Sequence, residues 1–212
     1  MLFPGLKNIS VIPNPISFNR QNLSHSSNKG SRKNLLSIGR LASEKQVDHI
    51  INAFFLLSTE FSSWDLVVYG SGPQEATLKK MVNELGLSTR VKFMGATSHP
   101  YIAYAQSDIF VMTSSGEGFP NTLLEAMAVG LPSVVYDCIS GPREISENGK
   151  FAILVPLNDQ LRLYKELRNL MLNPLLRMSL GSQAAESVYK RYELKLILKK
   201  WYSLINQVIL SK

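Results

Sequence analysis

The chain has 212 residues, of which 45% are hydrophobic, 18% charged and 9% aromatic, which suits a globular protein of one domain with extensions. No apolar run reaches the roughly 18 residues that span a bilayer, and no basic patch precedes an apolar core at the N-terminus, so we expect neither a membrane span nor a secretory signal. The single cysteine, Cys138, excludes an internal disulfide and favours a reducing, cytoplasmic compartment, and the three scattered histidines argue against structural zinc.

The net charge of +7 is unevenly distributed along the chain. Residues 1–46 hold seven Lys/Arg and one Glu, residues 190–212 hold six Lys/Arg and one Glu, and the middle holds ten basic and fourteen acidic residues. Basic ends suit phosphate groups, an anionic membrane surface or nucleic acid, and solubility alone would explain them equally well. The basic residues lack the interleaved aromatic side chains that single-strand binders use, so we do not expect nucleic-acid binding.

Before residue 34 the chain has the composition of a linker. Residues 11–16 are apolar but interrupted by prolines, which indicates an edge strand or an extended segment, and residues 19–33 are rich in Asn, Ser, Gln, Lys and Gly, which is typical of a loop. We therefore expect residues 1–33 to form an extended N-terminal linker, residues 34–190 the main domain and residues 191–212 a C-terminal helix.

From residue 34 short apolar runs alternate with stretches of helical spacing. The expected strands are 34–38, 65–69, 91–93, 108–112, 133–136 and 151–155. The expected helices are 47–59, 74–85, 98–106 with Ser98 as a candidate cap, 121–129, and the chain from 158 onward with Pro174 and Gly181 as breaks. This alternation predicts parallel βαβ units, and so an α/β fold with a parallel sheet flanked by helices. Ligands of such sheets bind outside the carboxyl ends of the strands, so the loops that follow strands are the candidate site.

The first of these loops is Gly39-Arg40-Leu41, with Lys45 four residues further on. Glycine permits a tight exit from the strand, and two cations beside a helix N-terminus could bind a diphosphate. Surface solvation is the alternative for the two cations when the loop is taken alone.

The second and third loops give weaker signals. Gly70-Ser71-Gly72-Pro73 either lets a ligand approach the backbone or simply turns the chain, and it is no dinucleotide fingerprint because Glu75 stands where a third glycine would be needed. The run from Val91 through Phe93 to Gly95 could line a base pocket with its backbone, or could simply end a strand.

The fourth loop, Ser114–Met127, gives the strongest signal. Gly116 and Gly118 flank Glu117 directly after a strand, which places a carboxylate on a loop at the expected ligand edge. Pro120 suits the first position of the next helix, whose free N–H groups would face an anion. Glu125, about one turn further on, can accept hydrogen bonds from sugar or ribose hydroxyls; the alternative is a glutamate that merely favours its helix terminus.

Several other activities are disfavoured by the sequence. Glu117 and Glu125 lie around one turn rather than across a bond, which disfavours a glycosidase pair. The chain has no Gly-x-Ser-x-Gly elbow and no Walker A motif. It also has no Asp-x-Asp pair to hold a divalent ion, so we expect no metal and no cofactor.

In this order, the loops resemble family 4 of the retaining GT-B glycosyltransferases, over about residues 9–210. The blocks that carry the resemblance are Gly39–Lys45, Gly70–Pro73, Val91–Gly95, Ser107–Val111, Glu117–Ala128, Gly130–Val135 and Gly141–Ile145. The resemblance implies that the chain is the Rossmann-like, nucleotide-sugar-binding C-terminal half of a GT-B fold, with a C-terminal helical extension.

The resemblance also implies residue roles. Arg40 and Lys45 would bind the donor diphosphate and steady the leaving group in place of a metal, Glu117 would lie near the donor sugar, and Glu125 would hold the ribose hydroxyls. The implied donor-binding residues are Gly39, Gly72, Phe93, Gly118, Phe119, Pro120, Asn121, Thr122, Leu123, Leu124 and Glu125. The Gly141–Glu144 loop resembles that of enzymes using UDP-linked hexoses, so UDP is favoured over GDP or ADP.

The acceptor-binding N-terminal domain of that family has no counterpart in this chain. In the family the last helix crosses back to that domain; here the candidate is Leu194–Leu210, whose apolar face would be Leu198, Trp201, Ile205 and Val208. That face is expected to be exposed or self-associating, or else to pack on this domain. Three alternatives stay open for the whole chain: a half-enzyme that works with a separate acceptor-binding chain, an epimerase on the same scaffold, and peripheral attachment to an anionic membrane at its inner face.

Overall fold

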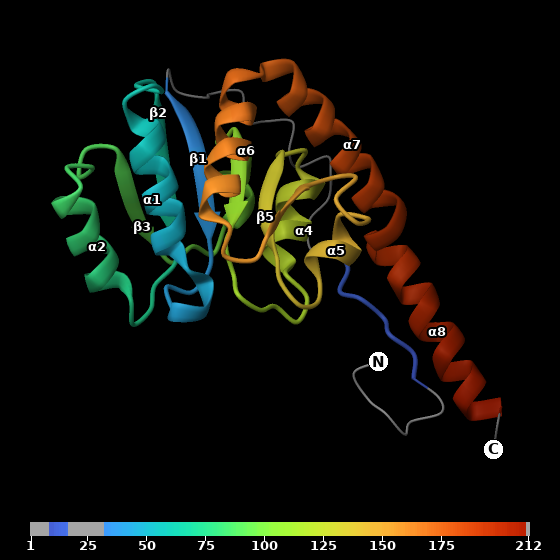
Figure 1. Cartoon of the computed structure of the whole chain (residues 1–212). Helices are drawn as coiled ribbons and strands as arrows, with labels where there is room; N and C mark the ends of the chain where they lie inside the picture. The colour runs from blue at the N-terminus through green and yellow to red at the C-terminus, as the bar shows by residue number, and fades with distance from the viewer. Residues whose placement is uncertain (1–8, 17–31, 211–212) are drawn as a thin grey trace.

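The structure is a computed structural model that describes residues 9–16 and 32–210. Its centre is a six-stranded sheet in the order β3-β2-β1-β4-β5-β6, in which every neighbouring pair is parallel (Figure 1). The strands are β1 (Lys33–Ile38), β2 (Trp64–Tyr69), β3 (Val91–Gly95), β4 (Ile109–Met112), β5 (Ser133–Asp137) and β6 (Ile153–Pro156). The expected Rossmann-like α/β fold is confirmed.

Helices cover both faces of the sheet, which explains why its strands are apolar at nearly every position. Alternation along each strand divides the core in two: Leu35 of β1 belongs to one cluster and Leu36 to the other. The first cluster lies under α1 (Val47–Ser58), α2 (Glu75–Glu84) and α6 (Gln160–Leu172). The second lies under α3 (Pro100–Ala105), α4 (Asn121–Ala128), α5 (Pro142–Ile145) and α7 (Pro174–Tyr192).

Most expected elements are found within two residues of their expected ends, and the exceptions have local causes. The third helix begins at Pro100 rather than Ser98, and Ser98 is not its cap, because His99 occupies the cap position and its N–H donates to Thr97 Oγ1 over 3.0 Å. Pro120 precedes α4 as its cap residue instead of opening the helix, since its ψ of 88° is not helical.

Glycine 181 does not break a helix as expected. It lies inside α7, where a Cβ would stand 2.0 Å from the carbonyl oxygen of Gly130 at the end of α4. The glycine therefore allows α7 to cross the end of α4 at close range.

Of the expected N-terminal linker, only residues 9–16 and 32–33 are described, and residues 9–16 form no strand. The N–H of Ile16 donates to the carbonyl oxygen of Tyr192 over 2.9 Å, so this segment lies beside the junction of α7 and α8 (Leu194–Leu210). The division at residues 33 and 190 stays a prediction.

The last helix, α8, has the expected bounds and runs away from the sheet (Figure 1). Ile197 near its start is buried, but the next four residues of the apolar face remain open: Leu198, Trp201, Ile205 and Val208 are 44%, 49%, 48% and 56% exposed. The alternative that this face packs on the domain is therefore wrong. No helix within the described residues is both long and apolar enough to cross a membrane.

Candidate functional site

The strand order reverses between β1 and β4, because the chain adds β2 and β3 on one side of β1 and then continues with β4 on the other. β1 and β4 are neighbours in the sheet, and the loops that follow them diverge. This leaves a hollow between the two loops at the carboxyl edge of the sheet. A cavity of about 330 Å³ lies there, lined by Ser37, Ile38, Gly39, Arg40, Lys45, Val47, Met112, Thr113, Ser114, Glu117, Phe119, Pro120, Asn121 and Thr122.

The cavity brings together the cations of the first loop and the carboxylate of the fourth. Lys45 Nζ lies 2.7 Å from Glu117 Oε1, and the Ser114 hydroxyl donates to the same oxygen over 2.6 Å. The Lys45 and Glu117 side chains are 25% and 13% exposed, so the ion pair is partly shielded from solvent. The structure thus brings together two candidate site residues that are 72 positions apart in the sequence.

A buried threonine fixes the backbone beneath this ion pair. The Thr113 hydroxyl, 1% exposed, lies 2.9 Å from the carbonyl oxygen of Lys45 and 2.8 Å from that of Gln46. The N–H of Ser115 donates to the carbonyl oxygen of Glu44 over 2.8 Å. The loop after β4 is thus joined to the loop after β1 at two points, which holds Lys45 opposite Glu117.

Arg40 also lines this cavity, but its electrostatic surroundings differ from those of Lys45. Its side chain is exposed, and no carboxylate of the described residues pairs with it. The cavity therefore offers one cation already neutralised, Lys45, and one without a counter-charge, Arg40.

The N-terminus of α4 adds open donors to this cavity. Its cap residue, Pro120, supplies no side-chain hydrogen bond, and the N–H groups of Leu123 and Leu124 donate to the Pro120 carbonyl over 3.1 and 3.2 Å. Within the described residues, the N–H groups of Asn121 and Thr122 have no acceptor. Free N–H groups at a helix N-terminus attract anions.

Leu123 and Leu124 are in a different position from the one expected of donor contacts. They are 0% and 1% exposed and lie in the core, and their N–H groups are already occupied. Of the run from Phe119 to Leu124, only the first four residues line the cavity.

The glycines of the second loop face protein backbone rather than the cavity. A Cβ on Gly72 would stand 2.4 Å from the Leu41 carbonyl oxygen, and a Cβ on Gly70 would stand 1.8 Å from that of Gly39. The N–H of Leu41 also donates to the Ser71 carbonyl over 2.9 Å. These glycines let the loop after β2 support the loop that carries Arg40.

Three further candidates lie outside the cavity. The Phe93 side chain packs on the core beneath α2 with Lys79 Nζ 5.8 Å from its ring centre, so only its backbone could serve a ligand. The Gly118 carbonyl accepts from the Ser140 hydroxyl over 2.9 Å. Glu125, on the second turn of α4, accepts at Oε2 from the hydroxyl of Tyr104 over 3.1 Å.

The loop after β5 packs against Pro120, the cap residue of α4. Gly141, with φ of 89°, packs so closely that a Cβ would stand 2.2 Å from Pro120 Cδ, and Arg143 Nε donates to Asp137 Oδ1 over 2.8 Å. At the cavity's rim, the Asn14 amide of the N-terminal segment donates to Asn121 Oδ1 over 3.1 Å. Sequence reasoning did not single out Thr113 or Tyr104, and it placed Ser114 in the fourth loop without a role. Hydroxyls directly after an apolar strand were the available signal for Thr113 and Ser114.

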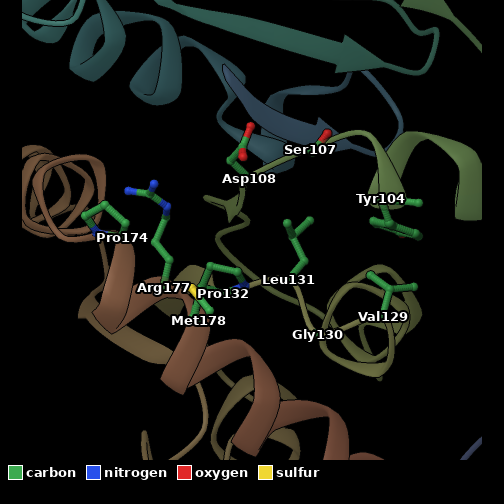
Figure 2. A pocket seen from close by; sticks show the side chains of 11 residues that line it. Tyr104, Ser107, Asp108, Val129, Gly130, Leu131, Pro132, Pro174, Arg177 and Met178 are labelled. Carbon is green, nitrogen blue, oxygen red and sulfur yellow. The ribbon is translucent and has the colours of Figure 1, made fainter. Parts of the chain in front are cut away.

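A second cavity, of about 370 Å³, lies at the amino edge of the sheet. Figure 2 shows the side chains that line it. Its lining includes Ser107 and Asp108, which precede β4, and Pro132, which precedes β5. Arg177 reaches into this region but is committed: its Nη1 donates to the carbonyl oxygens of Leu170 and Met171 at the end of α6. The described residues contain no cluster of three or more side chains suited to a metal ion.

Comparison with known proteins supports the assignment of the fold. The family model described as "Glycosyl transferases group 1" matches residues 19–187. An exopolysaccharide phosphotransferase of Streptomyces coelicolor is 35% identical over 178 residues, covering 84% of this chain and 19% of that protein. An uncharacterized glycosyltransferase of Haemophilus influenzae is 29% identical over 177 residues, covering 84% of this chain and 50% of that protein. The chain therefore spans half or less of the length of these two relatives.

Among solved structures, a Staphylococcus aureus TarM variant in complex with fondaparinux, α-GlcNAc-glycerol and UDP superposes with a TM-score of 0.79. It is 26% identical, and the match covers 85% of this chain and 36% of that one. The fold is that of the C-terminal half of GT-B glycosyltransferases.

Proposed function

The chain belongs to the group 1 glycosyltransferases, and on that premise we propose that it is the donor-binding half of a retaining, family 4 enzyme. In this proposal it binds a nucleoside diphosphate sugar, and the complete enzyme transfers the hexose to a saccharide or a lipid-linked acceptor. The carrying observation is the cavity at the strand reversal, which combines Arg40, Lys45 and the open N–H groups of α4.

These groups suit a diphosphate. Arg40 has no counter-charge within the described residues. Asn121 and Thr122 line the same cavity, and their N–H groups have no acceptor in the described part of the chain. A charge-assisted hydrogen bond contributes about 1.5–3 kcal/mol, so two or three of them give useful affinity for a phosphate pair. Lys45 can add to this by exchanging part of its contact with Glu117 for a phosphate oxygen.

The same charges suit the departure of the diphosphate. In the transfer, the bond between the anomeric carbon and the diphosphate oxygen breaks, and that oxygen keeps the electron pair. Arg40 and Lys45 stabilise this developing negative charge without a metal ion. Lys45 and Ser114 hold Glu117 through Oε1, and in this proposal its Oε2 accepts hydrogen bonds from the sugar hydroxyls.

We propose UDP as the nucleotide, since the TarM variant that this chain resembles was captured with UDP. Glu125 would hold the ribose hydroxyls, and the backbone of Phe93 and Gly95 at the end of β3 would lie beside the base.

We propose that the acceptor is bound by a further part of the protein or by a separate chain. The relatives are at least twice as long as the matched segment, and α8 presents an exposed apolar face of Leu198, Trp201, Ile205 and Val208. Exposed apolar faces of this kind mark docking surfaces.

On the opposite face of α8, Lys195, Lys199 and Lys200 are exposed, and we propose that they contact an anionic membrane surface.

Calorimetric titration of the chain with UDP, GDP, ADP and uridine tests the proposal. We expect UDP to bind, uridine to bind at least tenfold more weakly because it lacks the diphosphate, and GDP and ADP to bind more weakly than UDP. A folded chain that binds none of the diphosphates, or binds uridine as well as UDP, would contradict it.

A further inference from the structure

A buried phenol touches the carboxylate that the proposed function assigns to the ribose. Tyr104 lies near the end of α3, Glu125 lies on the second turn of α4, and the Tyr104 hydroxyl donates to Glu125 Oε2 over 3.1 Å. The two residues are 21 positions apart and come from neighbouring helices on one face of the sheet. The contact therefore couples the helix that follows β3 to the helix that follows β4.

The Tyr104 ring is itself held in place. Tyr104 is 1% exposed, and its ring packs edge-on against Phe110 of β4, with centroids 6.0 Å apart and an interplanar angle of 68°. A side chain enclosed in this way has one orientation available, so its hydroxyl is a fixed donor. The chain thus supplies Glu125 with a rigid point of attachment.

Burial also keeps the Tyr104 hydroxyl in its protonated, hydrogen-bond-donating form. Burial, and secondarily the negative charge of Glu125, raise the pKa of Tyr104 above its ordinary value of 10.0. The phenol therefore keeps its proton at neutral pH, and the contact is a hydrogen bond from Tyr104 to Glu125. An ionised carboxylate has about four acceptor sites, so the hydrogen bond from Tyr104 uses only one part of its accepting capacity.

We propose that Tyr104 is a positioning residue that orients the Glu125 carboxylate for the two ribose hydroxyls of the donor nucleotide. This inference rests on the proposed function, because it assumes that a nucleoside diphosphate sugar binds at the strand reversal. A glutamate on a solvent-facing helix ordinarily samples several rotamers, and a ligand that needs one of them must first restrict the side chain. In this chain the restriction is present before the ligand binds.

A purely structural role makes a different prediction. If the Tyr104 hydroxyl only satisfied its own buried polar group, its loss would lower stability, and it would affect all nucleotides alike. If it positions Glu125, its loss affects only ligands that carry the ribose hydroxyls.

The test compares Tyr104→Phe with the unmodified chain, using UDP and 2′,3′-dideoxyuridine diphosphate as ligands in calorimetric titrations. We expect the substitution to weaken UDP binding about three- to tenfold and to leave binding of the dideoxy analogue unchanged. In a Glu125→Gln background, Tyr104→Phe should then have no further effect on UDP. The control is Tyr136→Phe, which removes another buried phenol hydroxyl, the one that contacts His49 on the other face of the sheet, and should not discriminate between the two ligands.

Equal losses for both nucleotides, or no loss for UDP, would overturn the inference while leaving the proposed function intact. Failure of the unmodified chain to bind UDP would remove both. If Tyr104→Phe does not fold, Glu125→Asp replaces it: the shorter side chain withdraws the carboxylate from the phenol and keeps the charge. Unchanged UDP affinity of that variant would overturn the inference equally.

Discussion

Two cavities of similar size lie at opposite edges of one sheet, and each is approached by an arginine. The cavity at the amino edge, about 370 Å³, contains Arg177, which is 9% exposed, donates to two carbonyl oxygens at the end of α6 and lies 5.3 Å from the ring centre of Trp64 (Figure 2). The cavity at the carboxyl edge, about 330 Å³, contains Arg40, which is exposed and has no counter-charge within the described residues.

This comparison shows that cavity volume alone does not identify the functional site. Burial lowers the pKa of Arg177, because the surroundings disfavour its charge, and its hydrogen bonds are already used by the fold. Because Arg40 is exposed, its charge has little effect on the free energy of unfolding, and its guanidinium N–H groups remain available to a ligand. An uncommitted charge beside open helix N–H groups is the better indication of function.

The largest expected effect is at the amino edge. Arg177→Ala should lower the free energy of unfolding by about 3 kcal/mol, since it leaves the carbonyl oxygens of Leu170 and Met171 without their donor and removes the contact with Trp64. Urea unfolding measures this. UDP affinity of the folded variant should be unchanged, and a variant that is fully stable would break the comparison.

The next effect is at the carboxyl edge. Arg40→Ala should weaken UDP binding about 10- to 100-fold, because one charge-assisted contact to the diphosphate is lost, and should change the free energy of unfolding by less than about 0.5 kcal/mol. The matched control is Lys165→Ala, which removes an exposed cation on α6 and should change neither quantity. An Arg40 variant that binds UDP normally but unfolds easily would reverse the roles of the two arginines.

A third, smaller effect concerns an exposed cation of α8, which lines neither of the two cavities compared above. Lys199→Ala on α8 should reduce partitioning onto vesicles containing phosphatidylglycerol about fivefold, since each lysine near an anionic surface contributes about 1 kcal/mol. Co-sedimentation measures the bound fraction. Binding that is the same for phosphatidylcholine vesicles, or the same for the variant, would exclude the proposed membrane contact.

The smallest effect separates the two cations of the carboxyl-edge cavity. Glu117→Gln should tighten UDP binding about threefold, because it frees Lys45 from a partly shielded ion pair and removes a negative charge near the phosphates. The same substitution should lower the rate of sugar transfer by the complete enzyme, where Glu117 faces the sugar. Weaker UDP binding by this variant would mean that Glu117, rather than Lys45, supports the nucleotide.

The sequence predicted the fold well because the fold depends on local patterns. The run Ile109–Met112 is apolar throughout because helices cover both faces of the sheet, and α8 keeps its period from Leu194 to Leu210. The two loops at the strand reversal could also be found, since a parallel sheet brings all its carboxyl ends to one edge.

What the sequence could not give is the use of each residue within those loops. Gly72 carries the same local signal whether it approaches a ligand or the Leu41 carbonyl, and only the three-dimensional packing distinguishes the two. Leu124 follows the cap of α4 closely enough to suggest a free N–H, yet the Pro120 carbonyl already accepts it. The contact of Tyr104 with Glu125 depends on how two helices approach, which no spacing in the sequence reports.

The most direct test of where the nucleotide binds is amide hydrogen exchange, followed by mass spectrometry, with and without UDP. We predict slower exchange in residues 39–46 and 113–122, which form the carboxyl-edge cavity, and unchanged exchange in residues 129–132 and 174–178 at the amino edge. Protection confined to residues 129–132 and 174–178 would place the nucleotide in the other cavity and contradict the account.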